Sequence, residues 1–410
     1  MWNTVRPMVL GSSELREAIR RACSWLTDIA QIKRQQLTDV QNSKNYEYQN
    51  WRGALRNEYS AATRQWDSFA PVWHTGQAVK ALCKAYQVLG DPALLQAARL
   101  GAGFIGNQRV NNEQHPWNGL ILAFEDQGDA VNTSGILECG DGLLLLSEIT
   151  GDPVYRDWII QALQVLADHM YIPGEGLFRD NLAVSDWQFF QSELGHPGRP
   201  LIDDAMFLRG YQLTGKSQFK NIFYETADRL LAEEEPAGNW IRFRPCSEQT
   251  GLLHPRHAYW WGLPMLLAFR DSGERKYLDC AVRAGQWYVE AQRRDGGLFR
   301  NTDRAYWTDS FGHATSGIAC AGILWHNLWK ITREDLWLAP LRSALNFCAA
   351  MQFVNPADPN LNGAVLEKVQ PPDGTDGSPY YLRDLGTTFF VQFAAILLLE
   401  ANPAIATDQP

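Results

Sequence analysis

The sequence has no apolar run long enough to cross a membrane. Its longest apolar stretches, such as Phe389 to Leu399, fall well short of the roughly 20 residues that a membrane-spanning helix needs. The N-terminal residues also lack a basic start followed by an apolar run, which is the pattern of a secretory signal. We therefore expect a cytoplasmic protein that makes no contact with a membrane.

Cysteine pairs and metal-binding motifs are missing as well. The seven cysteines are scattered and include no CxxC pair, which argues against a disulfide framework and a cysteine zinc site. The sequence has no HExxH and no cluster of histidines and carboxylates with metal-ligand spacing. Phosphate-loop, dinucleotide-binding and GxSxG motifs are absent too. We expect no metal, no cofactor and no nucleophilic serine.

The chain has no basic cluster, and its net charge is −9, which argues against nucleic acid as a partner. Tryptophan, in contrast, is abundant, with 16 residues. Trp and Tyr offer flat apolar faces with a polar edge, and such faces suit sugar rings. A large helical core also uses big side chains, so composition alone leaves both explanations open.

One pattern recurs along the chain at intervals of about 60 residues. A helix ends in a tight turn, and a second helix then opens with Tyr, Phe or Leu. The turn falls at Gly90, Gly151, Gly215, Gly273 and near Arg333. In each unit the first helix is apolar nearly all round and the second is amphipathic. The first helix is therefore predicted to lie inside and the second outside.

A further apolar helix, LGTTFFVQFAAILLLE, lies near the C-terminus. Only the N-terminal helix, from Ser13 to about Ile32, is left to pair with it. Pairing of the two chain ends closes a ring. We therefore predict an all-α (α/α)6 toroid, or six-hairpin barrel, formed by residues 1–410 as a single domain without convincing strands. A straight helical solenoid is the alternative, but it would not need the chain ends to pair.

If the inner helices all begin at one end of the ring, the residues that open them converge on one pocket. Loops at such a mouth are where functional residues concentrate. The openings combine polar and aromatic residues: WHTGQ (73–77), ECGDG (138–142), IDDAM (202–206), HAYWWG (257–262), DSFGHATSG (309–317) and RDLGTT (383–388). A purely structural toroid needs at most one capping residue at each opening. We therefore predict the functional site here.

Asp141 is the first catalytic candidate because it lies among glycines and leucines. Burial raises the pKa of a carboxyl group, and a raised pKa suits a general acid; a structural salt bridge or cap is the alternative. Glu138 lies one turn earlier on the same face. Asp203 and Asp204 open the next inner helix, where one could cap the helix while the other faces the site. We predict Asp204 as catalytic, and Glu138 and Asp203 as substrate contacts.

His74 and His313 open inner helices at equivalent positions in different repeats. We predict His313 as catalytic and His74 as substrate-binding, and a scaffold role is the alternative for both. The other predicted substrate contacts at these openings are Trp73, Gln77, His257, Trp260 and Trp261. At least one of the two adjacent tryptophans is expected to belong to the core.

Several arginines could bind an acidic substrate. We predict Arg179 and Arg383 in this role, with Arg199 and Arg300 as alternatives. A pair between Arg383 and its neighbour Asp384 would occupy Arg383.

Three segments resemble the six-hairpin glycosidases, and specifically the unsaturated glucuronyl and unsaturated rhamnogalacturonyl hydrolases. The DGL segment at 141–143 resembles the family's segment that holds the catalytic aspartate. The GLF segment at 176–178, followed by DW at 186–187, resembles its GLxxH…W loop, and residues 309–319 are similar to its (E/D)TSAxAM helix opening. The chain departs from the family where LIDDAMFL stands in place of WxRGxGW, and where Arg179 stands in place of a histidine.

The resemblance implies hydration of an unsaturated uronic acid without a cofactor. Asp141 would protonate the C4=C5 double bond and then activate water for addition at C5. The hemiketal would open and release the reducing-end sugar, while an arginine or histidine receives the uronate carboxylate. The partner would be an oligosaccharide, and the chain a monomer or homodimer.

Three other functions stay open. A uronate lyase or epimerase on the same toroid would abstract a proton with His, Tyr or Arg, and His74, His257 and Tyr259 would serve. A non-catalytic glycan-binding or scaffold protein would need no acid or base. An isoprenoid-cyclase-like toroid is suggested only by QRRDGG (292–297), and the acidic DxDD cluster of such enzymes is missing.

Overall fold

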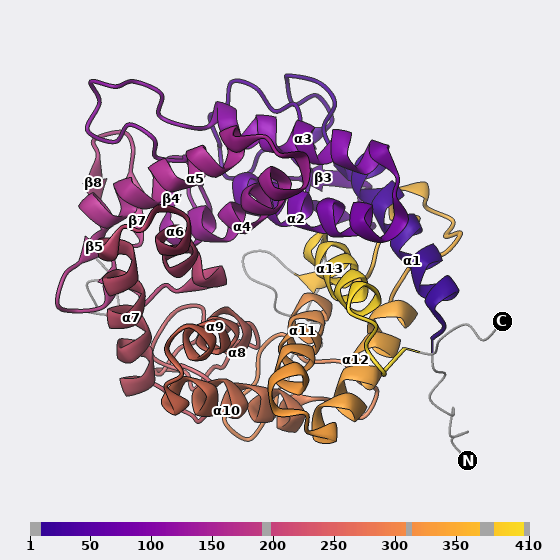
Figure 1. The fold of residues 1–410 in the computed structure, drawn as a ribbon. Coiled ribbons are helices and arrows are strands. Elements are labelled where there is room, and N and C mark those ends of the chain that lie inside the picture. The colour runs from indigo at the N-terminus through magenta and orange to yellow at the C-terminus, as the bar shows by residue number, and fades with distance from the viewer. Residues whose placement is uncertain (1–9, 191–197, 309–313, 370–380, 406–410) are drawn as a thin grey trace, which may run out of the picture.

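The computed structural model describes residues 10–190, 198–308, 314–369 and 381–405, in which two concentric rings of helices surround one axis (Figure 1). The inner helices are α2 (Pro71–Leu89), α4 (Thr133–Thr150), α6 (Met206–Thr214), α8 (His257–Trp260) with α9 (Gly262–Ser272), α11 (Thr315–Thr332) and α13 (Leu385–Leu399). The outer helices are α1 (Ser12–Ser24), α3 (Pro92–Asn107), α5 (Pro153–Val165), α7 (Ser217–Ala232), α10 (Arg275–Ala291) and α12 (Leu338–Ala350). The alternation confirms the predicted (α/α)6 toroid. None of the helices in these ranges is long and apolar enough to cross a membrane.

Left-handed residues make the tight turns between inner and outer helices. Gly90, Gly151, Gly215 and Gly273 have φ values of 70°, 71°, 71° and 74°, and Arg333 has 58°. A Cβ at any of these four glycines would meet nothing within 4 Å. Glycine therefore serves the backbone angle here and not close packing. The predicted turn positions are confirmed.

Capping residues directly after these turns start two of the outer helices. Asp91 caps α3 by accepting a hydrogen bond from the Ala93 backbone N–H at 2.9 Å. Asp152 caps α5 in the same way, and a proline takes the first position of both helices. Such caps satisfy backbone donors that a helix start leaves without partners.

The N-terminal helix packs beside the last inner helix. Helix α1 packs against α13 and α2, and Figure 1 shows it beside α13. Directly after α1, the fully buried indole of Trp25 donates a hydrogen bond to the Asn360 carbonyl at 2.7 Å. The first and last parts of the described chain are thus joined.

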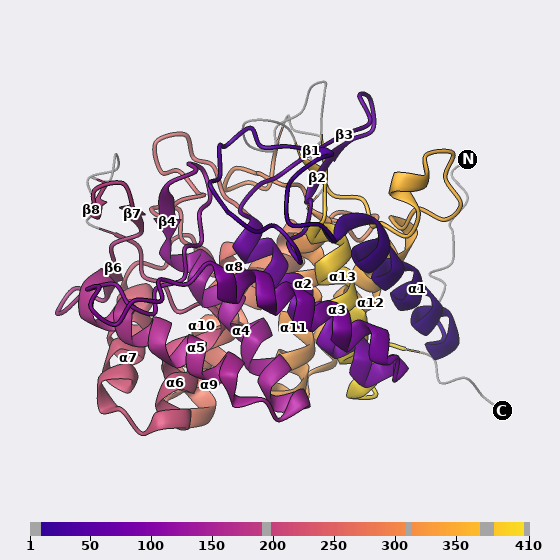
Figure 2. The ribbon, with the colours of Figure 1, turned by 90° about the horizontal axis from the view of Figure 1, so that it is seen from above.

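Short strands lie in the return loops, although the sequence predicted none. Their bounds are β1 (Val40–Gln41), β2 (Glu58–Ser60), β3 (Gln65–Asp67), β4 (Ala130–Asn132), β5 (Tyr171–Ile172), β6 (Leu177–Phe178), β7 (Asn181–Ala183), β8 (Gln188–Phe189), β9 (Lys368–Val369) and β10 (Tyr381–Arg383). They form sheets ordered β1-β3-β2-β10-β9, β4-β7-β8 and β5-β6. Strands of two or three residues are too short to show an alternating pattern in sequence. Figure 2 shows many of them along one side of the ring, and β4 and β10 lead directly into α4 and α13.

Helices α2 and α4 cross with their backbones in close contact. A Cβ on Gly76 would lie 2.4 Å from the Cys139 Cα, and a Cβ on Gly142 would lie 2.2 Å from the Gly76 carbonyl oxygen. Only glycine at both positions permits this approach. The crossing brings the opening of α2 against the first turns of α4.

Candidate active site

Side chains from three inner helices meet at Glu138, at the end of the ring where the inner helices begin. The indole N–H groups of Trp73 on α2 and Trp260 on α8 both donate to Glu138 Oε2, at 2.8 and 3.1 Å. Glu138 itself is only 2% exposed. The structure therefore brings together three residues that the sequence predicted as substrate contacts.

The Glu138 carboxyl group has a strongly altered acidity. Burial, followed by the negative charge of Asp203, raises its pKa to about 8, while Arg256 and the Trp73 hydrogen bond act in the opposite direction. Glu138 therefore holds a proton at neutral pH. Its protonated form can donate a hydrogen bond as well as accept one.

Asp203 is a second buried carboxyl group with a raised pKa. It is 2% exposed, and its Oδ2 is buried without a hydrogen-bond partner among the described residues. Burial raises the pKa to about 7 against the opposing charge of Arg199, and Asp204 adds to the rise. Neither Asp203 nor Asp204 caps the helix by its side chain. Instead Asp204 and Ala205 have φ values of 50° and 52°, a strained turn of the kind found at functional sites.

Arg256 is a buried cation that the sequence analysis did not single out. It is 3% exposed, and its Nε and Nη2 have no hydrogen-bond partner among the described residues. Its guanidinium carbon lies 4.8 Å from the ring centres of Trp73 and Trp260 and 5.1 Å from that of Phe389. Aromatic faces stabilise the charge but leave its N–H donors unused. The HPRHAYWW segment does hold a signal, an arginine among aromatic residues at a helix opening.

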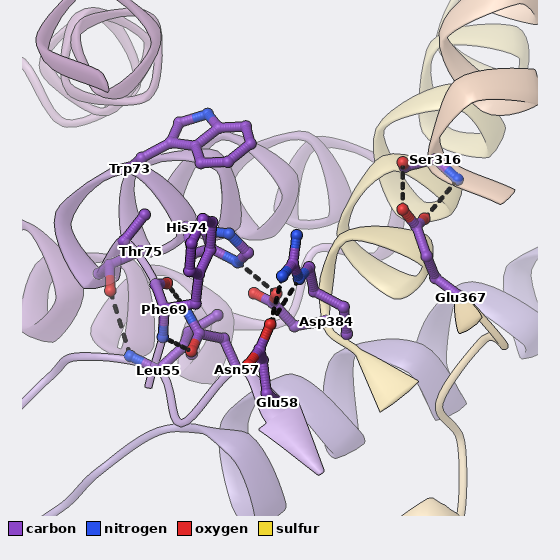
Figure 3. A network of polar contacts seen from close by, with 12 residues as sticks. Leu55, Asn57, Glu58, Phe69, Trp73, His74, Thr75, Ser316, Glu367 and Asp384 are labelled. Atoms are coloured by element: carbon purple, nitrogen blue, oxygen red, sulfur yellow. Dashed lines mark hydrogen bonds and ion pairs between the residues drawn. The ribbon is translucent and has the colours of Figure 1, made fainter. Parts of the chain in front are cut away.

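His74 is held by a carboxylate from the other end of the chain. Its Nδ1 lies 2.5 Å from Asp384 Oδ1, and Figure 3 shows the ring facing Asp384. The His74 Nε2 is buried without a partner in the described part of the chain. The neighbouring Arg383 pairs with Glu58, with Nε at 2.9 Å from Oε1. The possible pair between Arg383 and Asp384 is not formed, because β10 pairs with β2 and places Arg383 opposite Glu58.

Asp141 does not have the raised pKa that its burial was expected to give. Lys80 Nζ lies 2.6 Å from its Oδ2, and Arg209 pairs with its Oδ1. Burial acts to raise the pKa, but Lys80 and then Arg209 outweigh it and hold the pKa of Asp141 far below its usual range. The expectation is wrong because Lys80 comes from α2 and Arg209 from α6. Asp141 stays ionised, which is the salt-bridge alternative that the sequence left open.

Asp204 belongs to the same buried ion cluster. Its Oδ1 lies 3.3 Å from Lys80 Nζ, so one lysine joins Asp141 and Asp204. Burial raises the pKa of Asp204, and Lys80 opposes that rise. Of the two adjacent aspartates, Asp203 is therefore the one left without a basic partner within hydrogen-bonding distance. These ion pairs occupy Asp141 and Asp204 and disfavour a proton-transfer role for either carboxylate.

Other predicted substrate contacts are engaged in the scaffold. The fully buried His257 has its ring nitrogens 3.2 Å from the Trp240 carbonyl and 3.0 Å from the Arg244 carbonyl, and burial lowers its pKa to about 3. Trp261 is buried and packs edge-on against Trp240, as expected for one of the two adjacent tryptophans. Gln77 donates to the Glu138 backbone carbonyl at 3.0 Å and thereby ties α2 to α4.

The remaining arginine candidates lie against other partners. Arg199 pairs with Asp180, with Nη2 at 3.0 Å from Oδ1. Arg300 Nη1 lies 3.6 Å from Glu367, which also accepts hydrogen bonds from the opening of α11 (Figure 3). Arg179 lies over a phenylalanine ring, 5.3 Å from its centre.

Two predictions remain, a catalytic role for His313 and the absence of a metal site. His313 lies outside the described residues. In the described ranges, no group of three or more His, Cys, Asp or Glu side chains is arranged to hold a metal ion.

Comparison with known proteins identifies the fold. No protein-family model and no curated protein sequence matches the chain, but solved structures do. An unsaturated glucuronyl hydrolase specific for heparin matches with a TM-score of 0.67 and 13% identity, over 97% of this chain and 100% of that one. Cellobiose 2-epimerase from Bacillus thermoamylovorans B4167 gives 0.66 and 11%, over 93% and 98%, and a polysaccharide lyase gives 0.61 and 14%, over 96% and 99%. At these identities the similarity concerns the fold alone, and the chain has the toroid fold that a uronyl hydrolase, a sugar epimerase and a polysaccharide lyase share.

Proposed function

We propose that the protein is a carbohydrate-active enzyme that acts on a uronate-containing oligosaccharide by acid/base chemistry, with Asp203 moving the proton. The observation that carries the proposal is the Asp203 carboxyl group, which is buried, has a pKa of about 7 and leaves Oδ2 without a partner among the described residues. A proton donor works best when its pKa lies near the working pH. Glu138 is a second buried carboxyl group with a raised pKa, about 8, and burial is the largest cause.

Arg256 supports an acidic substrate. A buried cation without a hydrogen-bonded partner costs free energy, and a bound carboxylate offsets that cost. Arginine binds carboxylates through two parallel N–H donors. The flanking Trp73 and Trp260 add apolar faces of the kind that contact sugar rings. A uronic acid combines both features in one residue.

Hydration of an unsaturated uronyl residue fits this set of groups. Asp203 would donate its proton to C4, and the positive charge that develops at C5 is stabilised by the ring oxygen. The resulting Asp203 carboxylate would then take a proton from the water that adds to C5. Opening of the hemiketal breaks the bond between C5 and the ring oxygen, and the sugar attached at C1 leaves. One water molecule is consumed and Asp203 ends protonated, as it began.

A second candidate is an epimerase or lyase that removes a proton from carbon. His74 favours it, because Asp384 holds Nδ1 and leaves the buried Nε2 without a partner in the described residues. A base oriented by a carboxylate is the usual arrangement for proton abstraction.

Ultraviolet absorbance separates the two candidates. A hydrolase destroys the conjugated double bond of unsaturated uronyl disaccharides, so absorbance falls. A lyase creates that bond from uronate polysaccharides, so absorbance rises, and an epimerase leaves it unchanged. A flat trace with every unsaturated disaccharide of a panel that covers the common uronate linkages contradicts the hydrolase proposal.

Asp203→Asn tests the assigned role. We expect turnover to fall by about 100-fold or more, the usual scale for losing a general acid, while the variant still folds and binds substrate. Asp157→Asn is the matched control, because Asp157 is exposed and its one ion pair among the described residues is with Arg156. Full turnover in Asp203→Asn would rule out Asp203 as the proton donor. In Arg256→Gln we expect a higher KM with a smaller change in kcat, because that side chain is assigned to binding.

A further inference from the structure

A hollow lies inside the inner ring and extends toward the end where the inner helices finish. It has a volume of about 700 Å³ and is lined by the later turns of the inner helices, including Lys84 on α2, Glu148 on α4, Arg270 on α9 and Asn327 on α11. Part of its wall is apolar, formed by Leu145, Leu208, Leu263, Leu267, Ile323 and Ile396. Its size and mixed lining are those of a small-molecule site.

The carboxylates of this wall already have basic partners. Asp141 and Asp204 contact Lys80, Glu148 lies 3.8 Å from Arg209, Asp271 lies 3.7 Å from Lys220, and Glu400 lies 2.9 Å from His326 and also pairs with Lys330. Among the described residues, Lys84 and Arg270 are the cations of the wall that have no ion pair or hydrogen bond from their side chains. The ion pairs of the wall therefore leave Lys84 and Arg270 as the cations without a close anionic partner in the described part of the chain.

The helix dipole explains why a positive charge is favourable at only one of these two positions. Arg270 lies in the last turn of α9, where a positive charge is favourable. Lys84 lies more than one turn before Leu89, where α2 ends, and the dipole effect falls off within the last turn. Burial and then repulsion by Lys80 lower the pKa of Lys84, while the charges of Asp141 and Glu400 oppose that change. A partly buried ammonium group without a hydrogen bond or close ion pair gains from an anion placed beside it.

We propose that this cavity binds a small organic anion, whose carboxylate or phosphate group pairs with Lys84 and whose body packs against the apolar wall. The proposal does not depend on the function assigned to Asp203. The Lys80, Asp141 and Asp204 cluster borders the cavity, whereas Glu138 and Arg256 are not part of its lining.

Isothermal titration calorimetry with three probes tests the site: glucose 6-phosphate, gluconate and uncharged glucose. We expect at least one of the two anions to bind the full chain and glucose not to bind. Lys84→Gln should weaken that binding by about tenfold or more, the value of one charge-assisted hydrogen bond. Lys276→Gln is the matched control, because Lys276 lies on outer helix α10 and pairs with Asp228. Arg256→Gln should leave the binding unchanged and so separates this cavity from the proposed active site.

Several results would overturn the proposal. These are failure of both anions to bind, equal affinity in Lys84→Gln, or loss of binding in Arg256→Gln. Thermal unfolding without ligand provides an independent check, because removal of a partly buried cation without a close ionic partner should not lower the Tm. A clearly lower Tm in Lys84→Gln would show that Lys84 serves the scaffold instead. Comparison of the two anions shows whether the site prefers phosphate or carboxylate.

Discussion

Glu138, Asp203 and Arg256 are ionisable side chains kept where charge is costly. Two of them are carboxyl groups whose pKa values are raised to about 8 and about 7, and the third is an arginine whose contacts are aromatic faces. Perturbed groups of this kind gather at functional sites because catalysis needs altered acidity. Lys80 and Asp141 show the contrast, since a close ion pair satisfies both.

Glu138→Gln should change how stability depends on pH. Between the usual carboxyl pKa and about 8, the folded protein holds a proton on Glu138 that the unfolded chain has lost. The free energy of unfolding must therefore fall as pH rises through this window. The glutamine side chain still offers an oxygen to the indole N–H groups of Trp73 and Trp260, but it has no group that titrates.

Urea unfolding measured at about pH 5 and about pH 8 checks this. We expect wild type to lose more stability than Glu138→Gln between the two conditions. Glu113→Gln, at an exposed position, should behave as wild type. Equal losses in wild type and Glu138→Gln would mean that Glu138 titrates normally.

At the scale of elements, the contact between α2 and α4 sets the geometry of the site. Gly76 and Gly142 let the two backbones touch, and this contact places Trp73 within hydrogen-bonding distance of Glu138. A strained turn before α6 then presents Asp203 while Lys80 holds Asp204. The proposed proton donor and a carboxylate held in an ion pair are thus adjacent residues.

Gly142→Ala should destabilise the protein and impair its activity. The new Cβ would lie 2.2 Å from the Gly76 carbonyl oxygen, so α2 and α4 must move apart. Overpacking of this kind costs about 1–3 kcal/mol in the free energy of unfolding. Gly103→Ala in α3 is the control, because its Cβ meets nothing within 4 Å, and it should gain up to about 1 kcal/mol. If chemical denaturation gives the same change in the free energy of unfolding for both variants, the close contact of α2 and α4 does not require glycine at position 142.

At the scale of the whole molecule, ring closure joins residues far apart in sequence. Trp25 contacts Trp66, with ring centres 6.2 Å apart, and bonds to Asn360. His74 meets Asp384, and Glu58 meets Arg383 (Figure 3). The closure therefore also completes the proposed active site, since His74 depends on a carboxylate from the C-terminal part of the chain.

Trp25→Ala should weaken this closure. Removal of a fully buried tryptophan costs about 3–5 kcal/mol, and here it also leaves the Asn360 carbonyl without its indole donor. Trp307→Ala is the control, because Trp307 is 65% exposed and its loss should change stability little. Denaturant unfolding followed by tryptophan fluorescence and circular dichroism measures both. A loss below about 1 kcal/mol in the free energy of unfolding of Trp25→Ala would show that the contacts of Trp25 are not needed to hold the ring closed.

Local signals made the helices, their turns and the closed ring predictable. Apolar periodicity and turn glycines such as Gly90 act within a few residues, and the leftover N-terminal helix had one possible partner. Convergence of Trp73, Glu138 and Trp260 followed from that ring, because helix openings at one end must meet. The short strands could not be predicted, because two or three residues are too few to show the alternation of apolar and polar residues that marks a strand.

Protonation and pairing, in contrast, were decided by tertiary structure. The sequence determines that Asp141 and Asp203 are buried carboxyl groups near helix openings, but burial alone acts in the same direction on both. Lys80 and Arg209, from two other helices, hold Asp141 ionised, whereas Asp203 keeps an oxygen without a partner among the described residues. The pKa of a carboxyl group depends on charges a few ångströms away, and residues distant in sequence supply those charges only after the chain has folded.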